Sequence, residues 1–326
     1  MMKALMLMEP NRMEIREIPV PEIGPVEVLV RVMACGVCNA TDLKVLKGIN
    51  RHWSKGVYPC TWGHEVTGFV EETGKEVTRV KKGDRVFLRI TRTGFAEFCK
   101  ANEMEVKVLP DNIGLEEGVL GQLMPIAVRG VEKTVKKGDA VMVVGQGPAG
   151  LLSLQVARAY GATKVYVSDL FPERLALAKS LGADACFRAD TEDAAERVKE
   201  LTGGVGVDVA IECGGMDKTF RQCEQALRKG GGIAVFGTHL NPVELDMVQW
   251  ESNSWYMYLA REQPVETAHL MDRTAELFAS GAVRVREILS HTFPLEKAAD
   301  AFLLLDKAPQ KCLKIALLPK LEESNE

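Results

Sequence analysis

The first feature with recognisable chemistry is a glycine-rich turn that follows an apolar run. Gly145, Gly147 and Gly150 come directly after Val141–Val144, and an acid, Asp169, follows about twenty residues later. In such a turn one glycine allows the tight bend, one lets the backbone approach a pyrophosphate, and one allows close packing of helix on strand. Because the positive N-terminus of the next helix then faces the phosphates, the pattern predicts a dinucleotide site.

Charged residues beyond the turn indicate which dinucleotide is bound. The carboxylate of Asp169 can accept hydrogen bonds from the adenosine ribose hydroxyls and repels a 2′-phosphate, which favours NAD over NADP. Arg174 is the exception, since it can attract a phosphate, line the adenine pocket or pair with Asp169. A helix cap before Pro172 is the alternative use of Asp169. The other predicted contacts are the remaining residues of the turn, Gln146, Pro148 and Ala149.

The second feature is a pair of soft-metal ligands upstream, Cys38 and the His64 of Gly63-His64-Glu65. Thiolate and imidazole are typical zinc ligands. Taken singly, Cys38 fits a small buried residue and His64 fits a core histidine. Together, and beside a dinucleotide motif, they favour a zinc site. The chemistry predicted from both features is metal-assisted hydride transfer between an alcohol and a nicotinamide coenzyme.

The elements that must position these residues fall into two patterns. From about residue 135, short β-branched strands alternate with helices, which predicts a parallel sheet covered on both faces. The predicted strands are Ala140–Val144, Lys164–Ser168, Val207–Ile211 and Gly232–Phe236, and the predicted helices are Ala149–Tyr160, Pro172–Leu181, Thr191–Leu201 and Lys218–Arg228. Residues before this region predict a mostly β unit with strands at Val26–Val32, Val66–Val70 and Arg85–Ile90. The tail predicts helices at Val265–Ser280 and Leu295–Leu305 and strands at Ile288–Thr292 and Lys311–Leu317.

Composition limits the class of protein. The 326 residues are enough for two domains, and a formal net charge of −4 argues against nucleic acid as a partner. No apolar run approaches the ~20 residues that span a bilayer. The apolar start Met1–Met8 is followed at once by Glu9-Pro10, which favours a first strand over a signal peptide and predicts a cytoplasmic protein. The eight cysteines are scattered, which favours thiols or metal ligands over disulfides.

Several motifs, in their order and spacing, resemble the zinc-containing medium-chain dehydrogenases over essentially the whole chain. They are Cys35-Gly-Val-Cys38, Thr41-Asp42, Gly63–Gly68, Gly83–Val86, Gly145–Gly150 and Phe293–Phe302. The sorbitol, threonine and archaeal glucose dehydrogenase branches are more similar than the liver-type enzymes. The resemblance implies an α/β protein in which a doubly wound Rossmann domain binds NAD and a GroES-like, mostly β domain carries the catalytic site. The implied boundaries are 1–124 and 258–326 for the catalytic domain and 125–257 for the NAD domain.

The same resemblance assigns the metal ligands. It implies that Cys38 and His64 hold a catalytic zinc and that Gln122 stands where the family usually has Glu or Cys. The amide oxygen of Gln122 can coordinate zinc, and Glu65 can join directly or through water. A set of thiolate, imidazole and amide leaves zinc with a net positive charge, whereas a Cys-His-Glu set is neutral.

Other family roles fall on the segment after Cys38. Asp42 is implied to orient His64, and Thr41 is implied to take the substrate proton. One extra residue in Asn39-Ala40 separates Cys38 from Thr41, and Lys44 occupies the place of a frequent relay histidine. The alternative for Lys44 is a solvated surface lysine.

A four-cysteine lobe that often holds a structural zinc in the family is missing. After Gly83–Val86 the chain runs through Arg89–Phe98 to a lone Cys99. We therefore expect one zinc per chain. Because edge strands of the cofactor domain often pair between subunits in this family, a homodimer or homotetramer is also expected.

The substrate predicted from the resemblance is a secondary alcohol of the polyol or sugar type. A threonine-like amino alcohol is the near alternative, and a zinc-free NAD(P)-dependent quinone or enoyl reductase on the same scaffold is the more distant one. Candidate substrate contacts, each equally consistent with a loop residue, are His52, Trp53, Trp62, Arg89 and Arg92. His239 is a candidate neighbour of the nicotinamide, with an ordinary loop residue as the alternative.

Overall fold

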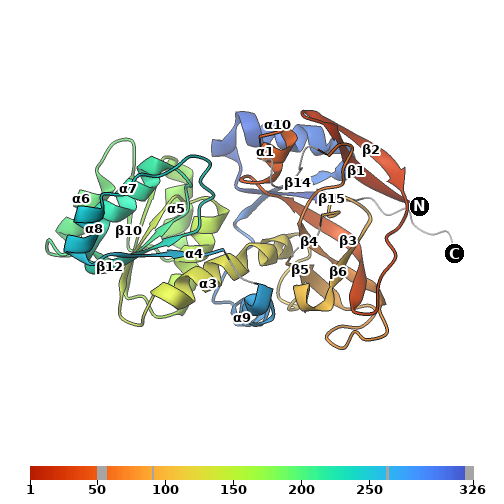
Figure 1. Cartoon of the computed structure of the whole chain (residues 1–326), viewed down its shortest axis with the longest axis horizontal. Coiled ribbons are helices and arrows are strands. Elements are labelled where there is room, and N and C mark those ends of the chain that lie inside the picture. The colour runs from red at the N-terminus through yellow and green to blue at the C-terminus, as the bar shows by residue number, and fades with distance from the viewer. Residues whose placement is uncertain (50–56, 90–91, 262–263, 320–326) are drawn as a thin grey trace. The chain divides into compact units, whose positions relative to one another are not determined.

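The computed structural model forms two compact units (Figure 1). It describes residues 1–49, 57–89, 92–261 and 264–319. Unit 1 comprises Met1–Leu123, Val265–Ala279 and Val285–Glu326. Unit 2 comprises Met124–Pro264 and Ser280–Arg284. Unit 1 is therefore assembled from segments that lie on both sides of unit 2 in the sequence.

Unit 1 is mostly β. Its strands are β1 Met2–Glu9, β2 Arg12–Ile18, β3 Glu27–Val37, β4 Glu65–Thr73, β5 Arg85–Leu88, β6 Phe98–Asn102, β7 Val106–Val108, β14 Leu289–Pro294 and β15 Lys314–Leu318. Its helices are α1 Asp42–Leu46, α9 Thr267–Ala279 and α10 Ala298–Lys307, with 3-10 turns η1 Glu103–Glu105, η2 Glu117–Gln122, η4 Leu295–Lys297 and η5 Pro309–Lys311. A further 3-10 turn, η3 Pro264–Glu266, crosses from unit 2 into unit 1. The main sheet has the order β14-β15-β3-β4-β5-β7, with β6 on β3.

Strand β3 is the centre of unit 1. It pairs with β4, β6 and β15, and most of its apolar residues, Val28, Val30, Val32, Cys35 and Val37, belong to one hydrophobic cluster of the unit. The predicted strand ended at Val32, whereas β3 continues to Val37. Cys35 therefore lies in the strand and packs in the core, where burial raises the pKa of its thiol. The Cys35-x-x-Cys38 spacing is thus not a surface redox pair.

Unit 2 contains the predicted parallel sheet, and the doubly wound fold is confirmed. The strands are β8 Ala140–Val144, β9 Lys164–Asp169, β10 Ala185–Arg188, β11 Val207–Glu212, β12 Leu227–Val235 and β13 Tyr256–Leu259. The helices are α3 Met124–Thr134, α4 Pro148–Ala159, α5 Pro172–Ser180, α6 Ala194–Leu201, α7 Asp217–Ala226 and α8 Met247–Asn253. All neighbours are parallel in the order β10-β9-β8-β11-β12-β13. The strand order reverses between β8 and β11, which is where such sheets bind dinucleotides.

Local differences from the predicted elements have identifiable causes. Helix α6 begins three residues late because the side chain of Asp193 caps it, accepting hydrogen bonds from the N–H groups of Ala195 and Glu196. The predicted helix to Arg228 ends at Ala226, since Leu227 already pairs with Val207 of β11.

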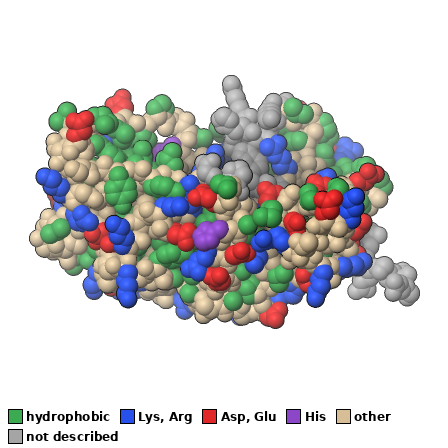
Figure 2. Space-filling model, turned by 60° about the horizontal axis from the view of Figure 1, so that its bottom comes forward, with side chains coloured by type: hydrophobic (Ala, Val, Ile, Leu, Met, Phe, Trp, Pro, Cys, Tyr) green, Lys and Arg blue, Asp and Glu red, His purple; other side chains and the backbone are tan. Residues whose placement is uncertain are grey.

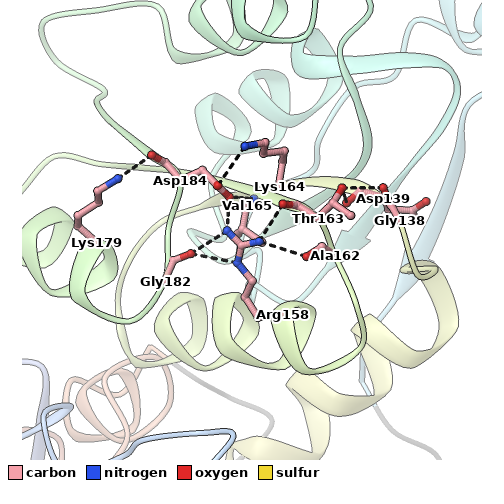
Figure 3. Close-up of polar contacts among 10 residues, drawn as sticks. All are labelled: Gly138, Asp139, Arg158, Ala162, Thr163, Lys164, Val165, Lys179, Gly182 and Asp184. Carbon is pink, nitrogen blue, oxygen red and sulfur yellow. Dashed lines mark hydrogen bonds and ion pairs between the residues drawn. The ribbon is translucent and has the colours of Figure 1, made fainter.

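A partly exposed polar network holds the C-terminal end of α4 to the loops that precede β9 and β10 (Figure 3). The Arg158 guanidinium donates to the carbonyls of Gly182 at 2.9 and 3.0 Å, Ala162 at 3.2 Å and Thr163 at 3.0 Å, and also pairs with Asp184. Asp184 in turn accepts a hydrogen bond of 2.7 Å from the Val165 N–H. The network fixes the helix that follows the glycine turn against β9.

The visible surface carries mixed charge. On the face in Figure 2, Lys and Arg side chains are interspersed with Asp and Glu over both units. Within the described ranges no helix is long and apolar enough to cross a bilayer.

Candidate active site

The candidate metal site begins where β3 ends. Cys38 follows the strand directly, and α1 starts four residues later at Asp42. The two residues are joined by a reciprocal pair of hydrogen bonds. The Asp42 N–H donates to the Cys38 carbonyl at 2.9 Å, and the Cys38 N–H donates to Asp42 Oδ2 at 2.8 Å. This short turn fixes the backbone from which the thiol projects.

His64 is held by the other oxygen of the same carboxylate. It precedes β4 and is buried, with its Nδ1 3.4 Å from Asp42 Oδ1. Burial by itself lowers the pKa of His64, but the Asp42 carboxylate and a hydrogen bond to Cys38 outweigh it, so the pKa is raised well above its ordinary value. One buried carboxylate thus contacts both the Cys38 backbone and the His64 imidazole, and its role in orienting His64 stays a prediction.

Glu65 is paired with a lysine that the sequence analysis did not single out. Lys314 Nζ donates to the two carboxylate oxygens of Glu65 at 2.6 and 2.8 Å and to the Val37 carbonyl at 3.2 Å. Lys314 is 2% exposed and Glu65 is 0% exposed. Burial lowers the pKa of Lys314, but the Glu65 carboxylate outweighs it and the pKa is raised, so the ammonium stays charged.

The ion pair lies across the central strand. Lys314 opens β15 and Glu65 opens β4, and both strands pair with β3, in which Gly36 is opposite Glu65. A Cβ atom on Gly36 would lie 2.2 Å from Glu65 Oε2. Gly36 therefore provides the space in which the carboxylate reaches the lysine.

The metal-ligating atoms of Cys38, His64 and Glu65 lie within 4.8 Å of one another, and this is the one such group of three among the described residues. A thiol, an imidazole and a carboxylate at this spacing fit a zinc ion. Gln122 is buried, 6% exposed, at the end of η2, the 3-10 turn that packs on β4 and β5. Its coordination stays a prediction.

Two further predicted residues lie beside the cluster. Thr41 is the N-cap of α1, yet its side chain makes no capping hydrogen bond, and the residue is half-buried. Lys44 is on α1 and half-buried. Their roles stay predictions, as do those of the candidate substrate contacts. His52 and Trp53 lie outside the described residues, and Trp62 is a core residue whose ring stacks on Phe302 at 5.0 Å.

In unit 2 the glycine turn depends on residues that lack side chains. Gly145 has a φ of +90°, which favours glycine. A Cβ on Gly150 would lie 1.8 Å from the Gly145 carbonyl oxygen, so helix α4 can approach the turn only because Gly150 lacks a side chain. A Cβ on Gly147 would meet nothing within 4 Å, which leaves open space at the N-cap of α4. Pro148 and Ala149 form the first turn of that helix.

Asp169 ends β9 beside this turn. Its Oδ2 accepts a hydrogen bond of 2.6 Å from the Gln146 N–H, and its Oδ1 accepts one of 2.9 Å from the Phe171 N–H. The carboxylate therefore ties the glycine turn to the loop after β9, and each oxygen keeps a lone pair for a ligand. The Arg174 guanidinium lies over the Phe171 ring at 4.6 Å.

Fold and site together define a class. A doubly wound sheet with a glycine cradle, together with a β unit that carries a Cys-His-Glu cluster, is the arrangement of a metal-assisted dehydrogenase. Comparison with known proteins agrees: residues 24–137 match the alcohol dehydrogenase GroES-like domain and residues 148–267 match the zinc-binding dehydrogenase domain.

Individual relatives span nearly the whole chain. L-threonine 3-dehydrogenase of Bacillus velezensis is 30% identical, over 94% of this chain and 95% of the relative. Sorbitol dehydrogenase of Bacillus subtilis is 27% identical, over 98% of this chain and 97% of the relative. A zinc-binding dehydrogenase of Sinorhizobium meliloti solved with NADP is 27% identical with a TM-score of 0.85, over 98% of this chain and 99% of that one.

The chain belongs to the zinc-dependent medium-chain dehydrogenase family. The predicted enzyme class is thereby confirmed: it is an oxidoreductase that acts on alcohols with zinc and a nicotinamide cofactor.

Proposed function

We propose that this enzyme oxidises a secondary alcohol of the polyol or sugar type with NAD, using a single zinc ion in unit 1. The observation that carries this proposal is the cluster of Cys38, His64 and Glu65, whose ligand atoms lie within 4.8 Å of one another. The buried Asp42 contacts both Cys38 and His64. The name of the sorbitol dehydrogenase relative supports a polyol substrate.

Cys38, His64 and Glu65 would hold the metal, with Gln122 as the further ligand. Zinc bound there supplies Lewis acidity at the substrate oxygen. Lys314 balances the charge of Glu65, because it bonds both carboxylate oxygens from the side of β15. The burial of Glu65 and Lys314 keeps water away from this side of the cluster.

Thr41 would take the proton that leaves the substrate hydroxyl. Its own hydroxyl group is not used to cap α1, so it can accept a hydrogen bond from the substrate hydroxyl and donate its own proton to a further acceptor. Lys44 lies one turn along the same helix and could accept the proton next only if its amine were neutral. We therefore assign it no role in proton transfer.

Residues Gly145, Gln146, Gly147, Pro148, Ala149 and Gly150 would bind the coenzyme pyrophosphate, and Asp169 the adenosine ribose. NAD held by these residues would supply the hydride-accepting chemistry. Asp169 supports NAD over NADP through repulsion of a 2′-phosphate.

We also propose that the enzyme is a homodimer or homotetramer formed through β13. This strand is the edge of the sheet in unit 2, and Tyr256, Met257 and Leu259 on it are exposed. An uncovered strand edge with apolar side chains favours pairing with a second copy. Sedimentation of the wild type and of a Met257→Lys variant tests this; a monomeric wild type would contradict it.

The experiment for the main proposal has two parts. Elemental analysis should give one zinc per chain in the wild type and loss of zinc in Cys38→Ser, while Cys99→Ser, which alters a core cysteine, keeps it. A panel of polyols, sugars and amino alcohols with NAD or NADP, followed at the nicotinamide absorbance, should give the highest kcat/KM with a polyol or sugar and NAD. Preference for threonine would support the amino-alcohol alternative, and metal-free turnover of a quinone would support the reductase.

A further inference from the structure

A second buried carboxylate lies outside the metal site, at the end of β11. Glu212 is 0% exposed. Its Oε1 accepts hydrogen bonds from the N–H groups of Gly214 and Gly215, both at 2.8 Å, and from Thr219 Oγ1 at 2.6 Å. Its Oε2 accepts none from the described residues. One oxygen thus organises the loop after β11, and the other has its bonding capacity unused.

The unused oxygen faces an imidazole on the neighbouring loop. His239 Nε2 lies 3.8 Å from Glu212 Oε2, is buried, and has no hydrogen-bond partner within the part of the chain that the structure describes. The ring contacts Phe220 edge to face at 6.3 Å, and 18% of the side chain is exposed. The histidine is therefore packed in place but remains reachable from outside.

Glycines bring the two loops together above the carboxylate. A Cβ on Gly237 would lie 2.3 Å from the Gly215 N and 2.4 Å from Glu212 Oε2. Gly215 has a φ of +69°, and a Cβ there would lie 2.7 Å from the Thr238 carbonyl oxygen. Backbone of the two loops therefore lies close over Glu212, and the partly exposed side chain of His239 lies beside its free oxygen.

The Glu212–His239 pair lies beyond the carboxyl ends of β11 and β12. The predicted pyrophosphate and adenosine contacts lie on the other half of the sheet, after β8 and β9. Asp169 ends β9, the glycine turn follows β8, and the loop after β11 is next to that turn, since a Cβ on Gly145 would lie 3.3 Å from Gly214 N. A dinucleotide bound at the reversal of strand order extends across both halves of such a sheet. With the adenosine at β9, the nicotinamide riboside half extends over the ends of β11 and β12.

We propose that His239 is a contact for the nicotinamide riboside half of the coenzyme and that Glu212 is the residue that positions its ring. In this proposal His239 carries its proton on Nε2, which lies 3.8 Å from Glu212 Oε2, and binding of the coenzyme closes that gap to a hydrogen bond. The exposed part of the ring then meets a hydrogen-bond donor of the ligand, a ribose hydroxyl or the carboxamide amino group. The inference rests on the coenzyme site described above.

Binding of coenzyme fragments tests the contact. His239→Phe keeps the aromatic packing on Phe220 and removes both ring nitrogens. Loss of one hydrogen bond should weaken NADH binding about tenfold, while the Kd of ADP, which lacks the nicotinamide riboside, stays within about twofold. ADP-ribose separates the two donors: its Kd rises if the ribose is contacted and is unchanged if the carboxamide is. His291→Phe, at a half-buried histidine of β14, is the control.

A double-mutant cycle tests the positioning role of Glu212. Glu212→Gln retains an oxygen for the Gly214 and Gly215 N–H groups and removes the charge facing the histidine. If Glu212 acts through His239, this substitution weakens NADH binding in the wild type and has little further effect in His239→Phe. Equal losses in both backgrounds would show a purely structural carboxylate and overturn the positioning role.

Failure of the inference and failure of the coenzyme site give different results. An unchanged NADH Kd in His239→Phe, or an equal loss for NADH and ADP, overturns the contact while the coenzyme site stands. Wild-type protein that binds neither NADH nor ADP overturns the coenzyme site and this inference with it.

Discussion

Replacing Lys314 by methionine should weaken the metal-free protein far more than the zinc-loaded protein. Methionine fills a similar volume but leaves the Glu65 carboxylate buried without the two hydrogen bonds of 2.6 and 2.8 Å. Breaking a buried ion pair in this way costs about 3–5 kcal/mol. If Glu65 is a zinc ligand, the bound cation takes over the role of counter-charge and removes much of that cost.

Lys314→Met should lose less stability in the zinc-loaded protein than in the metal-free protein. Because binding to the folded state and stability are linked, this difference appears as a gain in zinc affinity. A relief of about 2–4 kcal/mol corresponds to zinc binding about 30- to 700-fold tighter in Lys314→Met. Two measurements are needed: urea midpoints with a chelator and with saturating zinc, and competition for zinc with a chromophoric chelator.

The matched control is Lys47→Met, because Lys47 pairs with Asp306 at a more exposed position. Exposed pairs contribute about 0–1 kcal/mol, so this variant should shift neither the urea midpoint nor the zinc affinity much. Equal destabilisation of Lys314→Met with and without zinc, at unchanged zinc affinity, would refute a role of Glu65 in the metal shell. No destabilisation in either state would refute the buried ion pair itself.

Substitutions at three other residues test the neighbourhood of the metal. Thr41→Val should lower kcat by about 10²- to 10⁴-fold with little change in KM, and Thr41→Ser should restore it; steady-state kinetics that leave kcat unchanged in Thr41→Val would exclude the hydroxyl from proton transfer. Asp42→Asn should lower zinc affinity about 10- to 100-fold in chelator competition, because it removes the charge that orients His64. Gln122→Glu should tighten zinc binding and move the kinetic pKa upward, since it adds a negative charge beside the metal; an unchanged affinity and pH profile would place Gln122 outside the metal shell.

The sequence predicts the fold well where local pattern and tertiary structure agree. Strand β8 has the predicted bounds because an apolar β-branched run between a lysine-rich turn and a glycine turn permits no other structure there. Fine boundaries depend on side chains and pairing partners instead: Asp193 delays α6 by capping it, and Leu227 ends α7 by pairing with β11. Neither effect has a periodic signature in the sequence.

The candidate site is predictable only in part, for the same reason. Cys38 and His64 belong to compact motifs, whereas Lys314 is about 250 residues away from Glu65, so only the pairing of β15 and β4 with β3 brings them together. The only sequence feature that points to the Lys314–Glu65 pair is a lysine inside an apolar strand, because a charge buried there requires a partner. Gly36 carries no signal at all, since its need for a missing side chain arises only when Glu65 lies beside it.

The contact between Arg158 and Asp184 lets us predict how the free energy of unfolding changes at acidic pH, independently of the metal (Figure 3). Burial raises the pKa of Asp184, but the Val165 N–H and Arg158 outweigh it, so the pKa lies below its ordinary value of 3.8. A carboxylate with a lowered folded pKa stabilises the fold above the unfolded value and loses that contribution as the pH falls through the folded value. Asp184→Asn should therefore lower the free energy of unfolding by about 1–2 kcal/mol at neutral pH, a Tm shift of roughly 2–8 °C. Calorimetry should show that the gap to the wild type is constant from pH 7 to about 5 and narrows below pH 3.8; a gap that widens on acidification would mean that Asp184 is stabilised in its protonated form.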